Sequence, residues 1–95
     1  MNLDEEVRRA GKAQEILGNE IFKESVREIE EALKEARLNS SIKDVEMREK
    51  LWAQEVALHS IIKKLESVIE TGQMASEQIR QQGLVERAKK IFSVN

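Results

Sequence analysis

The sequence predicts an all-α protein in which two long helices form an antiparallel hairpin, with one helix before it and a loosely packed helical segment after it. Three observations support this fold class. The 95-residue chain has no proline, four glycines and 36% charged residues, a composition typical of helices with solvated outer faces. Apolar residues recur every three or four positions over long stretches, which is the period of a helix. A loop over residues 39–43 separates the two strongest stretches, and so short a connection suits antiparallel neighbours.

The first expected element is an N-terminal helix over residues 1–18. Three acidic residues at positions 4–6 suit the partial positive charge at a helix N-terminus. We predict a kink or short turn at Gly18-Asn19, because glycine suits the end of a helix and asparagine is a good N-cap. The helix is weakly amphipathic, because two members of its apolar stripe are alanines: Leu3, Val7, Ala10, Ala13, Ile16 and Leu17.

The second expected helix spans residues 19–38 and carries a regular packing seam. Its apolar residues step by four, three and four positions, the spacing by which helices pack on one another. These residues are Phe22, Val26, Ile29 and Leu33. The opposite side alternates acidic and basic residues and is expected to face solvent.

The third expected helix spans residues 44–72 and is apolar on two sides. Asp44 is the expected N-cap, with Ser41 as the alternative, and Gly72 is the expected end. A second apolar patch lies opposite the main stripe and consists of Val45, Trp52 and Val56. A helix with two apolar sides needs two neighbours. The main stripe includes Leu51, Leu58, Ile62, Leu65 and Ile69.

Residues 73–95 form a looser helical tail, with an interruption expected at Gly83. Its apolar residues are spaced less regularly, and three glutamines around Arg80 dilute any core-facing stripe. We expect this tail to dock on a partner or to fray. Together the four segments are expected to form a single domain over residues 1–95. A chain of this length buries a limited core, so an oligomer is also expected.

Charge and composition narrow the setting of the protein. The formal net charge is −2, which argues against a protein devoted to nucleic acid. Residues 1–40 hold ten acids and seven bases, residues 41–72 six and five, and residues 73–95 two and four. The absence of cysteine suits a reducing cytoplasm. No apolar run is long enough for a membrane span, so we expect no membrane insertion, and the N-terminus lacks the apolar block of a signal peptide.

The search for catalytic and metal-binding residues argues against an enzyme. Glu55 and His59 stand four residues apart and could share a weak metal site, but zinc sites need three or four ligands. His59 is more simply a residue at the border of the Trp52 patch. No glycine-rich phosphate loop or nucleophile motif occurs. No cofactor is expected. Four acids fit a solvated helix face better than a catalytic pair: Glu28, Glu30, Glu31 and Glu35.

Two surfaces remain as candidate binding sites. The apolar stripes are the expected interface with another copy, although the Trp52 patch could instead be covered by residues 3–17 folding back. The basic residues of the tail could contact nucleic acid, although a solvated helix end explains them more simply. The candidate interface residues are Phe22, Val26, Ile29, Leu33, Trp52, Val56, Leu58, Ile62, Leu65 and Ile69. The candidate nucleic-acid contacts are Arg80, Arg87, Lys89 and Lys90.

Three segments resemble a group of small helical proteins encoded by tailed bacteriophages. Residues 19–22 match an Asn-x-x-Phe helix start, although Glu20 stands where the group has proline. Residues 44–52 match a loop aspartate before an Arg-Glu-x-Leu-Trp run, and residues 65–72 match Leu-Glu-x-Val-x-x-Thr-Gly. The similarity covers about residues 14–75. It implies a phage origin, a non-enzymatic role and a place in the host cytoplasm or on the virion, and it supplies no catalytic residues.

The leading hypothesis is therefore a structural or protein-interaction protein, a phage accessory or assembly factor that acts through helical oligomerisation. Its expected partner is another copy of the chain, with another phage or host protein as the alternative. The competing hypothesis is a small phage DNA-binding or packaging protein that uses the basic tail.

Overall fold

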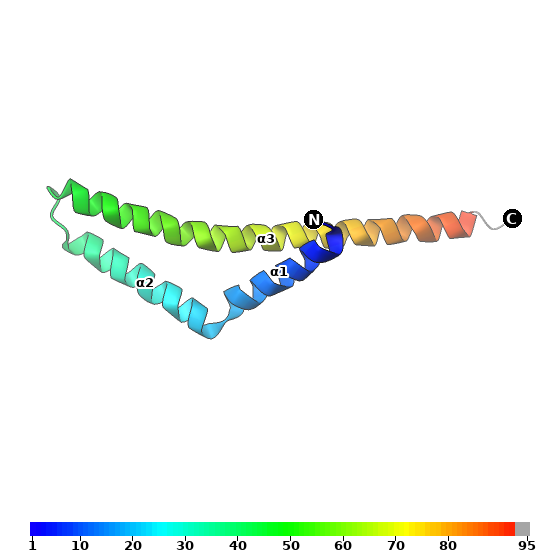
Figure 1. Cartoon of the computed structure of the whole chain (residues 1–95), viewed down its shortest axis with the longest axis horizontal. Helices are drawn as coiled ribbons and strands as arrows, with labels where there is room; N and C mark the ends of the chain where they lie inside the picture. The colour runs from blue at the N-terminus through cyan, green and yellow to red at the C-terminus, as the bar shows by residue number, and fades with distance from the viewer. Residues whose placement is uncertain (93–95) are drawn as a thin grey trace. The chain divides into compact units, whose positions relative to one another are not determined.

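The described chain, residues 1–92 of the computed structural model, consists of three α-helices and contains no strand (Figure 1). They are α1 (Leu3–Gly18), α2 (Glu20–Asn39) and α3 (Val45–Phe92). Helices account for 91% of the described residues, which confirms the all-α prediction. Residues 93–95, the end of the predicted tail, lie outside the described residues.

Local capping sets the helix boundaries, and two of the predicted boundaries are confirmed. The Phe22 backbone N–H donates to Asn19 Oδ1 at 2.9 Å, so Asn19 caps α2 directly after Gly18 ends α1. The Met47 N–H donates to Asp44 Oδ1 at 3.0 Å, which makes Asp44 the cap of α3. Each cap satisfies a backbone donor that has no partner in the first turn of a helix.

The predicted end at Gly72 and the predicted interruption at Gly83 are both wrong. Helix α3 runs for 48 residues through both glycines, so the segment after Gly72 is the second part of α3 and not a separate helix. A helical glycine costs about 1 kcal/mol relative to alanine, which is too little to end a helix without other stop signals. Gln73, Met74 and Ala75 follow Gly72 and are good helix formers, and among residues 1–92 no glycine has positive φ.

The chain forms two compact units where the sequence predicts one domain. The hairpin unit is Glu15–Leu65, and it contains the end of α1, all of α2 and the first part of α3. The terminal unit combines Met1–Gln14 with Glu66–Asn95, so it contains most of α1 and the second part of α3. Each unit has its own small core.

In the hairpin unit, α2 runs antiparallel to the first part of α3 (Figure 1). The buried residues of this unit are Leu33 and Leu51. Leu33 and Leu58 line one hollow between the helices, and Phe22 and Ile62 line another. The expected seam of each helix therefore meets the seam of the other within the same chain.

In the terminal unit, small residues let α1 approach α3 closely. Ala10, Ala13 and Ala75 are buried, and Gly72 faces Ala10. A Cβ atom placed on Gly72 would overlap the Ala10 side chain and would lie 2.9 Å from the backbone oxygen of Glu6. Gly72 is therefore a contact point between two helices. The alanines that make the α1 stripe weakly apolar are the residues that permit this contact.

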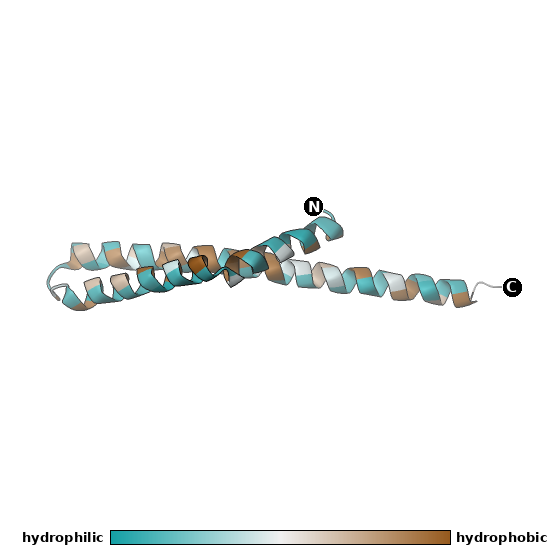
Figure 2. Cartoon of the chain, turned by 90° about the horizontal axis from the view of Figure 1, so that it is seen from below, coloured by the Kyte–Doolittle hydropathy of each residue, from teal (hydrophilic) through white to brown (hydrophobic). Residues whose placement is uncertain are grey.

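The second part of α3 extends beyond the contact with α1. Every described residue from Ser76 to Phe92 is exposed, and no part of α1 runs beside this stretch (Figures 1 and 2). We call residues 76–92 the C-terminal arm. Among residues 1–92, no helix combines the length and the apolar composition that crossing a membrane would require.

The two glycines of α3 give a matched test of the close contact. We expect Gly72→Ala to lower the free energy of unfolding by about 1–3 kcal/mol, because the added methyl group overpacks the contact with Ala10. Gly83 has no neighbour within 4 Å, so Gly83→Ala is the control and should stabilise the protein by up to about 1 kcal/mol. Urea unfolding followed by circular dichroism measures both. Equal stabilisation by the two substitutions would contradict the contact.

Candidate interaction surfaces

Much of the predicted interface set is used inside the chain. Leu33 is buried, and the remaining seam residues in this set are half-buried, except Ile29, which is 48% exposed. Ile69 is also half-buried, in the terminal unit. Three residues of the set therefore remain exposed: Ile29, Trp52 and Val56. The half-buried residues of the set are Phe22, Val26, Leu58, Ile62, Leu65 and Ile69.

One side of the hairpin unit, which we call the bridged flank, carries charged contacts between α2 and α3. Arg37 Nη1 donates to Glu55 Oε1 at 2.7 Å. His59 Nε2 lies 3.9 Å from Glu30 Oε1. On α2, the flank consists of charged residues at helical spacing: Lys23, Arg27, Glu30, Lys34 and Arg37. These long side chains lie across the edge of the seam on this side.

The suggested metal pair is not assembled in the hairpin unit. Glu55 binds Arg37, while His59 approaches Glu30 and keeps 63% of its side chain exposed. Within residues 1–92, no three His, Cys, Asp or Glu side chains are close enough together to hold a metal ion. His59 lies at the edge of the bridged flank. The sequence predicted a position for it at the border of the Trp52 patch.

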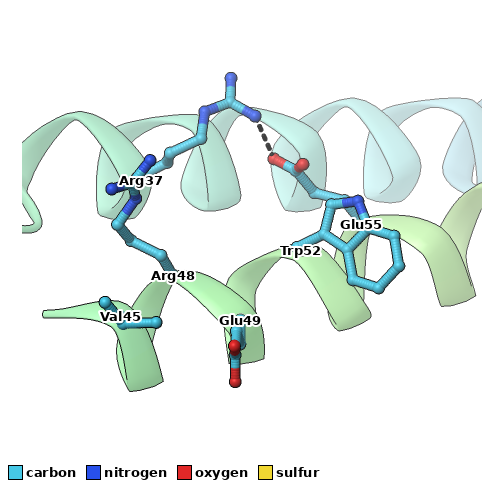
Figure 3. Close-up of a pocket in the computed structure, with 6 residues that line it drawn as sticks. All are labelled: Arg37, Val45, Arg48, Glu49, Trp52 and Glu55. Atoms are coloured by element: carbon cyan, nitrogen blue, oxygen red, sulfur yellow. Dashed lines mark hydrogen bonds and ion pairs between the residues drawn. The ribbon is translucent and has the colours of Figure 1, made fainter. Parts of the chain in front are cut away.

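The Trp52 patch borders an open hollow of about 430 Å³ (Figure 3). Trp52 is 67% exposed and Val56 43% exposed, so neither is covered within the chain. Arg37 reaches over the hollow toward Glu55, and Arg48 Nη1 donates to the backbone oxygen of Ile42 at 3.2 Å. The Trp52 indole therefore presents apolar surface to solvent.

On the other side of the hairpin unit, no hydrogen bond or ion pair joins α2 to the described part of α3. We call this side the open flank. On α2 it consists of residues that directly precede seam positions, together with Ile29. Its members are Ile21, Ser25, Ile29 and Ala32 on α2, and Met47, Gln54, Ala57 and Ile61 on α3. Sequence reasoning missed this flank, although the signal was present. Before three of the seam positions of α2 stand the small or apolar residues Ile21, Ser25 and Ala32, whereas the residues after the seam positions of α2 are charged.

The C-terminal arm carries a row of bases with apolar residues among and beside them. Arg80 donates two hydrogen bonds to the Glu77 carboxylate, at 2.6 and 3.1 Å, and Gln81 donates a third. These bonds lower the pKa of Glu77, with Arg80 as the main cause, and the Glu77 carboxylate raises the pKa of Arg80. Arg87 and Lys90 lie seven and ten residues after Arg80, which puts them on its face of the helix. Leu84 and Ile91 lie among these bases, four residues after Arg80 and Arg87, and Val85, Ala88 and Phe92 lie on an adjoining side of the helix.

Comparison with known proteins does not assign this chain to a family. No protein-family model, curated protein or solved structure matches it. The surfaces described above are therefore the basis for interpreting its function.

Proposed function

We propose that this protein is a non-enzymatic structural or interaction protein that works by helix-mediated self-association. The observation that carries this proposal is the imbalance between buried and exposed apolar side chains. Leu33 and Leu51 are the only large apolar residues that the described structure buries, whereas eighteen large hydrophobic residues are exposed. So small a core stabilises a chain weakly, and covering part of the exposed apolar surface with another copy would add the missing burial.

Trp52 is the strongest single anchor for such an interface. Tryptophan is enriched among the residues that dominate binding free energies, because a large rigid side chain buries much area at low entropic cost. Trp52 and its neighbours Val45 and Val56 are each more than two fifths exposed. The hollow beside them offers space for a side chain from a partner.

The resemblance to small helical proteins of tailed bacteriophages supports a role as a phage accessory or assembly factor. Such a protein would act in the host cytoplasm or on the virion. Its first partner is another copy of this chain, and a second phage or host protein is the alternative partner. Glu30, Glu55 and His59 support this non-enzymatic interpretation, because they engage in contacts on an open surface and leave no enclosed space for a substrate.

We expect Trp52→Ala to weaken self-association about tenfold or more, because loss of an interface tryptophan commonly costs more than 2 kcal/mol. Light scattering coupled to size-exclusion chromatography, over a concentration series, measures the mass. Circular dichroism should show unchanged helicity, since the side chain is 67% exposed. Ile42→Ala is the matched control, because Ile42 is 84% exposed in the loop. A wild-type protein that stays monomeric at high micromolar concentration contradicts self-association.

The aligned bases of the C-terminal arm favour one second candidate, a DNA-binding or packaging function. A helix without neighbours in its own unit can lie against a phosphate backbone, and Arg87, Lys89 and Lys90 are exposed there. The net charge of the chain opposes this function, as does the Glu77 carboxylate beside Arg80.

Replacement of Arg87, Lys89 and Lys90 by alanine tests this second candidate. If the arm binds DNA, the triple variant should bind duplex DNA at low salt at least about tenfold more weakly than the wild type, because each phosphate contact releases counterions. The wild-type affinity should fall steeply as salt rises. Fluorescence anisotropy with a labelled duplex measures both effects. Absence of wild-type binding at low salt eliminates the candidate.

A further inference from the structure

The two flanks of the hairpin unit differ in the contacts between α2 and α3 and in the exposure of their apolar side chains. The bridged flank holds the Arg37–Glu55 hydrogen bond and the close approach of His59 to Glu30. The open flank carries small and apolar side chains together with Gln54. Four of them are large and exposed: Ile21, Ile29, Met47 and Ile61. The helices can therefore be covered from the open flank without breaking any contact between α2 and α3 on the bridged side.

The open flank lies between an acidic edge and a more basic edge. The acidic edge is on α2, where residues at helical spacing include no base: Glu24, Glu28, Glu31 and Glu35. The edge on α3 carries Lys50 and Lys64, with Glu46 as its single acid near the helix start. Neither Glu28 nor Lys64 forms an ion pair with the described residues of the same chain. A partner that packs on this flank should place basic residues opposite the acidic edge and acidic residues opposite the more basic edge.

We propose that the partner is a second copy of the chain, whose open flank packs on this one about a two-fold axis parallel to the helices to form a four-helix bundle. This inference rests on the proposed self-association and names the surface that performs it. Two face-to-face arrangements have two-fold symmetry. An axis perpendicular to the helices would place α2 on α2 and acid on acid. The axis parallel to the helices places α2 on α3 of the other copy, with acid beside base along both edges.

The Arg37–Glu55 bond fixes which charges meet in this arrangement. Glu28 lies nine residues before Arg37 on α2, and Lys64 lies nine residues after Glu55 on α3. Because the two helices are antiparallel, Glu28 and Lys64 are at the same height along the hairpin. A two-fold axis parallel to the helices keeps this height, so Glu28 of each copy faces Lys64 of the other. The bundle contains this pair twice.

The apolar flank and the charged edges contribute differently to the association. Burial of Ile29, Ala32, Ala57 and Ile61 supplies the free energy of association, and the small residues among them let the helices approach closely. Exposed ion pairs add little affinity, but like charges in the same place are strongly disfavoured. The edges therefore select the orientation of the second copy.

Charge reversal with mixing of variants tests the proposal. Glu28→Lys and Lys64→Glu should each weaken homodimer formation about tenfold, because each creates two like-charged pairs across the axis. An equimolar mixture of the two variants should recover wild-type association, since the mixed dimer restores both opposite-charge pairs. Sedimentation equilibrium measures the dissociation constants, and circular dichroism checks the helicity of each variant. Lys63→Glu is the matched control, because it makes the same charge change on a different face of α3 and should leave association unchanged.

The outcomes separate this inference from the proposed function. Single variants that associate like the wild type overturn the inference, as does a mixture that fails to recover. Recovery only when both substitutions are in one chain also overturns it, because the pair would then be intramolecular. If Trp52→Ala still weakens association in those cases, self-association stands and another surface performs it. A monomeric wild type overturns both proposals. Ala57→Glu, in the middle of the open flank, should abolish the dimer while helicity is retained.

Discussion

Two helices that pair in a hairpin can each cover only one stripe of the other, and this limit governs the whole protein. The seam between α2 and α3 buries Leu33 and Leu51 and half-buries Phe22, Val26, Leu58, Ile62 and Leu65. Most other apolar residues of the hairpin unit stay at the surface. The exposed Trp52 patch and the open flank both follow from this geometry.

The long helix α3 is covered by different kinds of side chain along its length. In the hairpin unit, large side chains fill the space beside α2. In the terminal unit, Gly72 and Ala75 bring α1 close to the helix backbone. Close packing of small residues buries little apolar area, so this contact positions α1 more than it stabilises the unit. Beyond it, the basic and apolar residues of the arm are exposed, without a covering element in their unit.

Charged residues in the hairpin unit mainly affect how α2 aligns with α3 and how a partner would be oriented. The Arg37–Glu55 bond sets the height of α2 against α3 and occupies one flank. The acids of α2 and the lysines of α3 border the other flank, where their attraction or repulsion depends on the orientation of a partner. Exposed charges of this kind contribute little to stability in water, but they separate one arrangement from another.

The sequence by itself determined the all-helical fold class, the break at Gly18-Asn19 and the cap at Asp44, because capping and periodicity are local properties. Periodicity also identified the apolar stripes, since it shows which residues share a face of a helix. Only the tertiary structure decided what covers each face. It turned the predicted interface stripe into an internal seam, and it made Gly72 a helix contact in place of a helix end. It also distinguished a bridged flank from an open one. These outcomes depend on residues far apart in the chain, and the spacing within one helix carries no information about its neighbour.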